Sequence, residues 1–350
     1  MKEFSIMNKK IGNDYPIFLI AEAGINHNGI ISLAKKLVDL AVKAECNAIK
    51  FQTFITEDLL LTETPKAEYQ KSKREESETF YEMIKKYELS QEDFRELNKY
   101  CREKGIIFLS TPFDEISVNF LAELNVPAFK IGSGDMNNFP LLELICSYKK
   151  PILLSTGMST LDEVKETVEF VRSNNISDIA IFQCTTNYPT SLEEINLNVI
   201  DLYKQEFPFA LIGFSDHSLG MEASIGAAAK GVKIIEKHIT LDKNMEGPDH
   251  SASLGPDELF NWVKSVRNIE KALGTKKKVP TESEKEIAKI ARKSIVTIKD
   301  LKEGEILTDE HISIKRPGSG IPPKYFKTIL GKKILKDISK NSIISWEDIE

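Results

Sequence analysis

The sequence predicts an α/β protein: a TIM (β/α)8 barrel followed by a small C-terminal domain of short strands and turns. Eight short apolar runs alternate with amphipathic helical segments up to Leu273, which is the order of elements in such a barrel. After Gly274 the chain changes to short apolar runs separated by glycine and proline. An open doubly wound sheet is the alternative, but it usually has fewer strands, and its dinucleotide-binding form begins with a glycine-rich turn that this chain lacks.

Each predicted strand is a run of mainly apolar residues that becomes polar at its C-terminal end, as in buried parallel strands. The eight runs are residues 17–23, 48–54, 106–112, 128–134, 151–157, 179–185, 210–216 and 234–240. Apolar residues at helical spacing lie between them. The clearest of these helices are 31–44, 91–104, 161–173 and 221–230, and a last helix is expected at 256–273.

A long excursion, residues 56–89, follows the second predicted strand and is rich in Glu, Lys and Thr. Loops of this length in a compact domain are often functional. Because it leaves the C-terminal end of a barrel strand, the excursion would lie above the active face as a lid or a specificity element. A solvated surface excursion is the alternative interpretation.

The second region of the chain is separate in composition. We expect the barrel at residues 1–274, a polar linker at 275–288 and the small domain at 289–350. Residues 275–350 carry more Lys and Arg than Asp and Glu, whereas the whole chain has a net charge of −6. A basic module suggests docking onto an acidic barrel or over an anionic substrate, although the excess could equally be scattered over the surface.

The composition, 41% hydrophobic and 29% charged, is that of an ordinary globular protein. No basic stripe with interleaved aromatic residues points to nucleic acid, so no nucleic-acid partner is expected. No run reaches the roughly 18 apolar residues of a membrane span, and the first ten residues lack a signal-peptide core. The four cysteines, without CxxC spacing, are expected to be reduced thiols of a cytoplasmic protein: Cys46, Cys101, Cys146 and Cys184.

Polar side chains stand at the C-terminal ends of the predicted strands, where TIM barrels carry their chemistry. They are Glu22, Lys50, Gln52, Ser110, Thr111, Lys130, Ser133, Ser155, Thr156, Thr185, Thr186, Ser215, His217 and His238. Lysines and hydroxyls that converge with backbone amides form an anion site, suited to phosphate and carboxylate. A Schiff-base lysine would give the same pattern, and a structural ion pair with Glu22 is a further alternative. Packing alone explains eight polar ends poorly, because a barrel interior normally excludes charge.

Two histidines close successive apolar runs, and neighbouring parallel strands would bring both imidazoles to one rim of the sheet. Two neutral imidazoles suit Mn, Fe, Co, Ni or Zn and leave positions open for a substrate oxygen. Alternatively, His217 and His238 each make only a local hydrogen bond. The other three are weaker candidates: His27 lies in the loop after the first strand, His250 is a third ligand, a hydroxyl partner or a helix-start residue, and His311 is expected to be structural.

Eight motifs, in order along nearly the whole chain, resemble the sialic acid (nonulosonate) synthase family, which includes N-acetylneuraminate and legionaminate synthases. They are AEAGINHNG at 21–29, KFQ at 50–52, LSTPF at 109–113, FKIGSG at 129–134, STG at 155–157, GFSDH at 213–217, EKH at 236–238 and GPD at 247–249. The C-terminal segment, with KRPG at 315–318, is similar to that family's antifreeze-like (SAF) domain.

The resemblance implies a transferase that condenses phosphoenolpyruvate with an N-acetylmannosamine-like 2-acetamido sugar and water. The products are a nine-carbon 2-keto sugar acid and phosphate. It also implies a domain-swapped homodimer and a divalent metal ion on His217 and His238, most often Mn2+, with Mg2+ or Co2+ as alternatives. N,N'-diacetyllegionaminate and pseudaminate synthases use the same chemistry on 2,4-diacetamido-6-deoxy sugars, so the sugar stays open.

By position, the resemblance assigns catalytic roles to Glu22, Lys50 and Lys130, with Glu22 placing the attacking water near the developing positive charge. Contacts to phosphoenolpyruvate are assigned to Lys50, Thr111, Lys130, Ser133, Ser155, Thr186 and Ser215. Contacts to the sugar are assigned to Gln52, Tyr188, Asp249 and Arg316, of which Arg316 would reach the sugar in the partner subunit's barrel. Bacterial sialic acid enzymes carry Asn where this chain has Thr186, and Asn187 follows, so either residue could contact the phosphate.

Three other functions fit parts of the pattern. Metal-dependent synthases of 3-deoxy-octulosonate or heptulosonate phosphates share the chemistry, but they usually lack the C-terminal domain and need extra basic residues for a sugar phosphate. A Schiff-base aldolase would use Lys130 or Lys50. A non-catalytic sugar- or ice-binding protein would use the C-terminal domain and would leave the polar strand ends unexplained.

Overall fold

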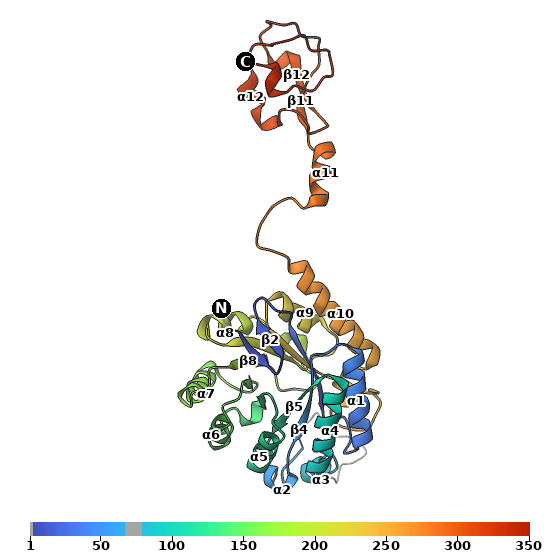
Figure 1. Ribbon diagram of the computed structural model, residues 1–350, viewed down its shortest axis with the longest axis vertical. Coiled ribbons are helices and arrows are strands. Elements are labelled where there is room, and N and C mark those ends of the chain that lie inside the picture. Colours follow the sequence, from blue (N-terminus) through green and yellow to red (C-terminus); the bar gives the residue numbers. More distant parts are fainter. Residues whose placement is uncertain (1–2, 67–78) are drawn as a thin grey trace. The chain divides into compact units, whose positions relative to one another are not determined.

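The computed structural model describes residues 3–66 and 79–350 of the chain (Figure 1). The chain divides into two compact units, Met1–Gly274 and Thr275–Glu350. None of the helices in these described ranges combines the length and apolar character that a membrane crossing requires.

The first unit is built around eight parallel strands. They are β3 (Phe18–Gly24), β4 (Ala48–Thr53), β5 (Ile107–Pro112), β6 (Phe129–Ile131), β7 (Ile152–Ser155), β8 (Ile179–Cys184), β9 (Leu211–Asp216) and β10 (Ile234–His238). Their order in the sheet is β5-β4-β3-β10-β9-β8-β7-β6, and β5 and β6 at the two ends lie beside each other. The sheet is therefore a nearly closed TIM-like barrel, which confirms the predicted fold.

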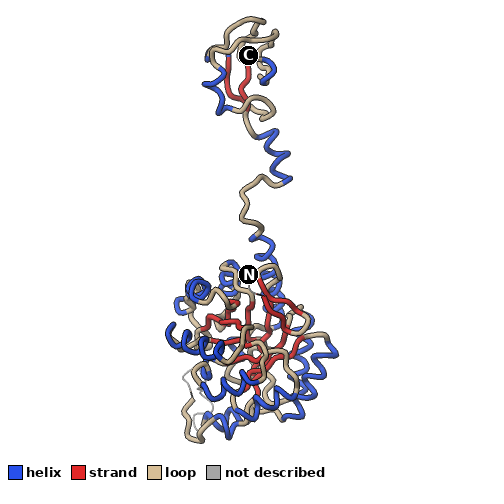
Figure 2. The backbone as a smooth tube through the Cα atoms, turned by 60° about the vertical axis from the view of Figure 1, so that its left-hand side comes forward, coloured by secondary structure: helices blue, strands red, loops and turns tan. Residues whose placement is uncertain are grey.

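Helices form an outer layer around these strands (Figures 1 and 2). They are α1 (Ile31–Lys43), α4 (Gln91–Lys104), α5 (Glu115–Glu123), α6 (Phe139–Ser147), α7 (Leu161–Ser173), α8 (Val199–Glu206), α9 (Glu222–Ala229) and α10 (Pro256–Leu273). Local sequence sets their ends. Capping boxes start α4 at Ser90 and α7 at Thr160, because each hydroxyl and the carboxylate three residues later satisfy free backbone amides. Gly105 ends α4 in the left-handed conformation.

The apolar core has two layers. Residues on the outer faces of the strands pack against the helices, with Trp262, Phe94 and Leu37 fully buried there. Inside the barrel, the first residues of the strands pack against a β-hairpin of β1 (Glu3–Ile6) and β2 (Lys9–Gly12) through Phe4, Ile6 and Ile11. The hairpin closes the N-terminal end of the barrel. This hairpin was not predicted, because two four-residue strands, the second of which begins with two lysines, give little periodic signal.

The excursion after β4 begins with α2 (Thr56–Leu59) and ends with α3 (Phe80–Lys85). Met83, Ile84 and Tyr87 pack against Ile25 and Phe54, which follow β3 and β4 at the C-terminal end of the barrel. Both ends of the excursion are therefore anchored on the face where the polar strand ends lie. The middle of the expected lid, residues 67–78, lies outside the described residues.

The second unit contains α11 (Glu282–Ala291), the antiparallel strands β11 (Ser294–Thr297) and β12 (Ile312–Lys315), and α12 (Phe326–Ile329). A small isoleucine-rich core holds it together. Helix α11 starts within the expected linker 275–288. A capping box between Thr281 and Glu284 nucleates this helix, a local signal that the polar composition of the segment had obscured.

Candidate active site

The polar strand ends meet in one cavity of about 180 Å³ at the C-terminal end of the barrel. Every strand, or the loop that follows it, contributes to the wall. The predicted residues on it are Glu22, Lys50, Gln52, Thr111, Lys130, Ser133, Ser155, Thr186, Tyr188, Ser215, His217 and His238. Three other polar strand-end residues bond elsewhere: Ser110 to Thr53, Thr156 to Tyr203 and the Phe182 carbonyl, and Thr185 to the Glu194 carbonyl.

Lys50 lies at the floor of the cavity between β3 and β5. Its Nζ is 2.8 Å from Glu22 Oε2 and donates to Thr111 Oγ1 at 3.0 Å. Burial by itself would lower the pKa of Lys50, but the carboxylates of Glu22 and Glu236 outweigh it and raise that pKa above its usual value. Lys50 is therefore a permanent buried cation, available to an anionic substrate.

Lys130 provides the second cation, from β6. Its Nζ donates to Ser155 Oγ and to the Ile131 carbonyl, and it lies 5.3 Å from the centre of the Phe182 ring. Burial lowers the pKa of this ammonium, and the positive charge of Lys50 adds to the effect, although Glu236 opposes it. The two lysines thus differ in how firmly they hold their protons.

Glu236 joins the two lysines and was not among the predicted site residues. Its Oε2 is 3.7 Å from Lys50 Nζ, its Oε1 is 3.9 Å from Lys130 Nζ, and Oε1 accepts from Ser215 Oγ at 2.9 Å. Burial would raise the pKa of Glu236, but the two lysines hold it below its usual value. The sequence did contain the signal: Glu236 precedes His238 by two residues, and alternation along a strand places both on the same face.

Glu22 is the second buried carboxyl group of this cavity with a shifted pKa. Burial raises its pKa to about 7, against the opposing charge of Lys50. A carboxyl group that changes charge near neutral pH, next to two lysines, is a common feature of catalytic sites.

Ser133 and Thr186 line the cavity, and their hydroxyls lie against Gly157. Gly157 N donates to Ser133 Oγ at 3.0 Å, and a Cβ added to Gly157 would lie 2.1 Å from Thr186 Oγ1 and 2.8 Å from Ser133 Oγ. The Thr186 hydroxyl is buried and has no hydrogen-bond partner among the described residues. Asn187 is exposed and does not line the cavity. Of the two candidates for the phosphate contact, Thr186 is the one that faces the site.

His217 and His238 also line the cavity, with ring centroids 5.6 Å apart. His217 Nδ1 donates to the Thr185 carbonyl at 2.7 Å, which leaves the Nε2 lone pair directed at the Tyr188 and Ser215 hydroxyls. His238 Nδ1 is buried and unpartnered among the described residues. Burial, together with His217 and Lys50, holds the pKa of His238 well below its usual value, so this ring is neutral.

The donor set fits a metal ion with two protein ligands. One imidazole has its tautomer fixed by a backbone carbonyl, and the other is neutral with a free nitrogen. Within the described ranges no group of three His, Cys, Asp or Glu side chains is arranged to hold a metal. The remaining coordination positions would therefore fall to substrate or water, as in catalytic metal sites.

Two family models match the chain. Residues 37–278 match the NeuB family, and residues 292–350 match the SAF domain.

The chain belongs to the NeuB family.

It is 44% identical to an uncharacterised protein of Methanocaldococcus jannaschii, over 100% of this chain and 99% of the relative. It is 41% identical to the N,N'-diacetyllegionaminic acid synthase of Legionella pneumophila, over 98% and 97%. The solved N-acetylneuraminic acid (sialic acid) synthetase of Leptospira borgpetersenii, in complex with citrate, is 34% identical with a TM-score of 0.72, over 82% of this chain and 95% of that one. The NeuB family thus comprises sialic, legionaminic and pseudaminic acid synthases, which are enzymes.

The residues assigned to the sugar by the NeuB-family resemblance are more dispersed. Tyr188 stacks on His217 at 4.2 Å between ring centroids, and Gln52 lines the cavity. Asp249 does not line the cavity. Burial raises the pKa of its carboxyl group to about 6, and the charge of His217 opposes part of that rise. Arg316 is an exposed residue of the second unit, directly after β12.

The other histidines of this NeuB-family chain do not line the cavity. His27 is fully buried rather than solvated, and its Nδ1 accepts from Gly29 N at 3.1 Å. His250 bonds to Thr240 Oγ1 at 2.7 Å and Asn28 Oδ1 at 3.0 Å, which makes it a hydroxyl partner. Burial lowers the pKa of both His27 and His250 to about 4.

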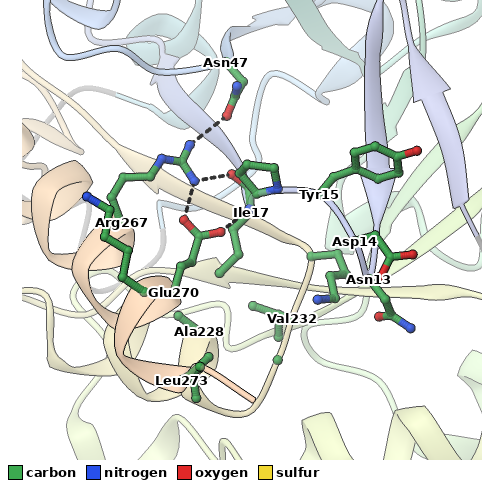
Figure 3. Close-up of a pocket in the computed structure, with 15 residues that line it drawn as sticks. Asn13, Asp14, Tyr15, Ile17, Asn47, Ala228, Val232, Arg267, Glu270 and Leu273 are labelled. Carbon is green, nitrogen blue, oxygen red and sulfur yellow. Dashed lines mark hydrogen bonds and ion pairs between the residues drawn. The ribbon is translucent and has the colours of Figure 1, made fainter. Parts of the chain in front are cut away.

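A larger cavity, of about 680 Å³, lies at the other end of the barrel (Figure 3). Its most prominent polar group is an ion pair in α10, in which Arg267 contacts Glu270 at 2.7 Å. Arg267 also donates to the Ile17 carbonyl at 2.8 Å and to Asn47 Oδ1 at 3.3 Å, and Glu270 accepts from Ile17 N (Figure 3). These groups satisfy one another at the starts of β3 and β4, so they brace the barrel.

Proposed function

We propose that this protein is a metal-dependent synthase that condenses phosphoenolpyruvate with a 2-acetamido sugar aldehyde and water. Carbon 3 of the enol attacks the aldehyde, water adds to carbon 2, and the C–O bond to phosphate breaks, which leaves a nine-carbon 2-keto sugar acid. One observation carries the proposal: two buried lysines, a row of small hydroxyls and two imidazoles share one cavity at the C-terminal end of the barrel.

The lysines and hydroxyls suit the two anionic groups of phosphoenolpyruvate. Lys50 and Lys130 supply two positive charges, and the Thr186 and Ser133 hydroxyls, which meet beside Gly157, supply donors for a phosphate oxygen. Fixed donors in a buried site cost little reorganisation when the substrate arrives.

Glu22 supports the addition of water. Positive charge develops at carbon 2 after the enol attacks, and a carboxylate next to it stabilises that charge and accepts a proton from the incoming water. The pKa of Glu22, raised to about 7 by burial, suits a group that takes up and returns a proton near neutral pH.

His217 and His238 would hold the divalent metal ion, Mn2+ being the first choice and Mg2+ or Co2+ the alternatives. When bound there, the ion would polarise the sugar aldehyde as a Lewis acid. Tyr188, whose ring lies against that of His217, and Gln52, which lines the cavity, would orient the sugar. Asp249, which does not line the cavity, is assigned to the sugar by the family resemblance alone.

N-acetylmannosamine is the first candidate for the sugar. The Legionella relative supports a second candidate, 2,4-diacetamido-2,4,6-trideoxymannose, because it is an N,N'-diacetyllegionaminic acid synthase and is 41% identical over 98% of the chain. We further propose a domain-swapped homodimer, in which Arg316 of the SAF domain reaches the sugar in the partner subunit's barrel.

Phosphate release from phosphoenolpyruvate tests the function. The purified protein, with Mn2+, is given N-acetylmannosamine, its 6-phosphate or 2,4-diacetamido-2,4,6-trideoxymannose. Release that depends on both metal and one aldehyde is expected, and the preferred aldehyde identifies the product. Absence of release with all three overturns the proposal.

Two controls separate this mechanism from its alternatives. His217→Ala is expected to lose Mn2+ binding and most of the activity, because one of only two protein ligands is removed. Borohydride in the presence of pyruvate would trap a covalent adduct on Lys130 or Lys50 in a Schiff-base aldolase. The proposal expects no adduct.

A further inference from the structure

A buried ion pair lies directly behind the two imidazoles. Asp216 precedes His217 and Lys237 precedes His238, and the two are register partners on β9 and β10. Neighbouring side chains along a strand point to opposite faces of the sheet. Because the two imidazoles point into the barrel, the side chains of Asp216 and Lys237 point outward. Lys237 Nζ lies 3.0 Å from Asp216 Oδ1, and the side chains are 2% and 0% exposed.

The pair also fixes the backbone on the far side of His217. Asp216 Oδ1 accepts from Ser218 N at 3.0 Å and from Ser218 Oγ, and Lys237 Nζ donates to the Ser218 carbonyl at 2.7 Å. Asp216 Oδ2 accepts from Ser224 Oγ on α9. Residues 216 and 218 are thus tied to each other, and both are tied to the residue before His238.

We propose that Asp216 and Lys237 are a positioning pair that sets the distance between the imidazoles of His217 and His238. The inference rests on the metal site of the proposed function and extends it to residues that touch neither metal nor substrate. The Lys237 side chain connects the backbone beside one imidazole to the backbone beside the other.

Energetics favour a positioning role over a purely stabilising one. Removing two charges from water costs several kcal/mol per ion in order of magnitude, so a buried pair often adds no net stability compared with apolar residues. A metal site, in contrast, needs its ligands placed to within a few tenths of an ångström, and groups behind the ligands commonly set that placement.

The test uses the full-length protein and Mn2+ alone as the probe, measured by the EPR signal of free Mn2+. The variants are Lys237→Met and the double variant Asp216→Asn with Lys237→Met, which removes both charges together and so leaves no unpaired buried ion. The matched control is Arg267→Met with Glu270→Gln, which removes the bracing ion pair at the opposite end of the barrel. Thermal unfolding is recorded for each variant.

We expect the double variant to unfold close to the wild-type temperature and to bind Mn2+ about 10- to 100-fold more weakly. The control is expected to lose stability but keep its Mn2+ affinity. Unchanged Mn2+ affinity in a folded double variant overturns the inference and leaves the proposed function standing. If the wild-type protein binds no Mn2+, the metal site and this inference both fail. If the wild-type protein binds Mn2+ more tightly than the double variant does, but no aldehyde supports phosphate release, only the proposed function fails.

Discussion

Lys50 and Glu22 form an ion pair on neighbouring strands, with 2.8 Å between Nζ and Oε2 and side chains only 4% and 2% exposed. The two residues are register partners on β3 and β4, so the hydrogen bonding of the barrel itself brings the charges together. Lys50 also donates to Thr111 and lies near Glu236. A substitution that removes one of these charged groups therefore changes the net charge beside a bound anion.

Glu22→Gln is expected to lower the rate of phosphate release by about 10²- to 10⁴-fold, since the amide keeps the shape of the carboxyl group but neither accepts a proton nor stabilises positive charge at carbon 2. Thermal unfolding is expected to show an intact fold. Glu270→Gln, at the opposite end of the barrel, is the matched control and should keep its rate. A rate close to wild type in Glu22→Gln would remove Glu22 from the mechanism.

Gly157→Ala is expected to raise the KM for phosphoenolpyruvate at least tenfold, which corresponds to about 1.4 kcal/mol of binding free energy. The new methyl group would lie 2.1 Å from Thr186 Oγ1 and 2.8 Å from Ser133 Oγ, and so would displace the two hydroxyls that we assign to the phosphate. Gly255→Ala, where the nearest atom lies 3.6 Å away, is the control. Steady-state kinetics with varied phosphoenolpyruvate distinguishes the outcomes, and an unchanged KM would place the phosphate elsewhere.

Arg316→Ala is expected to raise the KM for the sugar while leaving the unfolding temperature unchanged. Arg316 is exposed, so its loss removes no packing from the second unit. Lys340→Ala removes another exposed cation from the same unit and serves as the control for net charge. Equal sugar kinetics in both variants would show that the SAF domain does not contribute Arg316 to the site.

Asp348→Asn is expected to destabilise the second unit at pH 7 by about 1.5–3 kcal/mol, the usual contribution of hydrogen bonds to a buried charge. Asp348 accepts from Ser345 N and Oγ, both at 2.7 Å, and its Oδ1 lies 2.6 Å from Lys336 Nζ. Burial would raise its pKa, but these contacts outweigh burial and hold the pKa below the usual value of 3.8.

The sign of the pH dependence follows from that shift. The stability that Asp348 contributes is fully present above its unfolded-state pKa and is lost as the pH falls through the lower, folded-state pKa. The difference between wild type and Asp348→Asn should therefore shrink as the solution is acidified below about pH 4. Hydrogen exchange of the amides in β11 measures it, with the exposed Asp309→Asn as control. A difference that stays constant with pH would contradict the assignment.

Much of the barrel could be read from local patterns. The helices predicted at 91–104, 161–173 and 256–273 have the same bounds in the structure, because capping residues and apolar periodicity act within a few positions of the chain. The N-terminal hairpin could not be read in this way. The role of Phe4, Ile6 and Ile11 can be seen only in the folded barrel, where these apolar side chains cover the N-terminal ends of the strands.

The site shows the same division. Position at the polar C-terminal ends of the strands selected the lysines and histidines, but it left Glu236 unassigned and gave no choice between Thr186 and Asn187. In the folded barrel Glu236 lies within 4 Å of two lysine ammonium groups, and of Thr186 and Asn187 only Thr186 lines the cavity.

The sequence by itself determined the barrel, the separate second unit and the set of polar side chains that reach one rim, because hydrophobic periodicity and capping are local properties of the chain. Only the tertiary structure decided which of the charged side chains lie close enough to form ion pairs. The Lys50–Glu22 pair, the place of Glu236 between two lysines and the Asp216–Lys237 pair behind the histidines all depend on strand register. Register is fixed by hydrogen bonds between segments far apart in the sequence, and those contacts exist only once the barrel has formed.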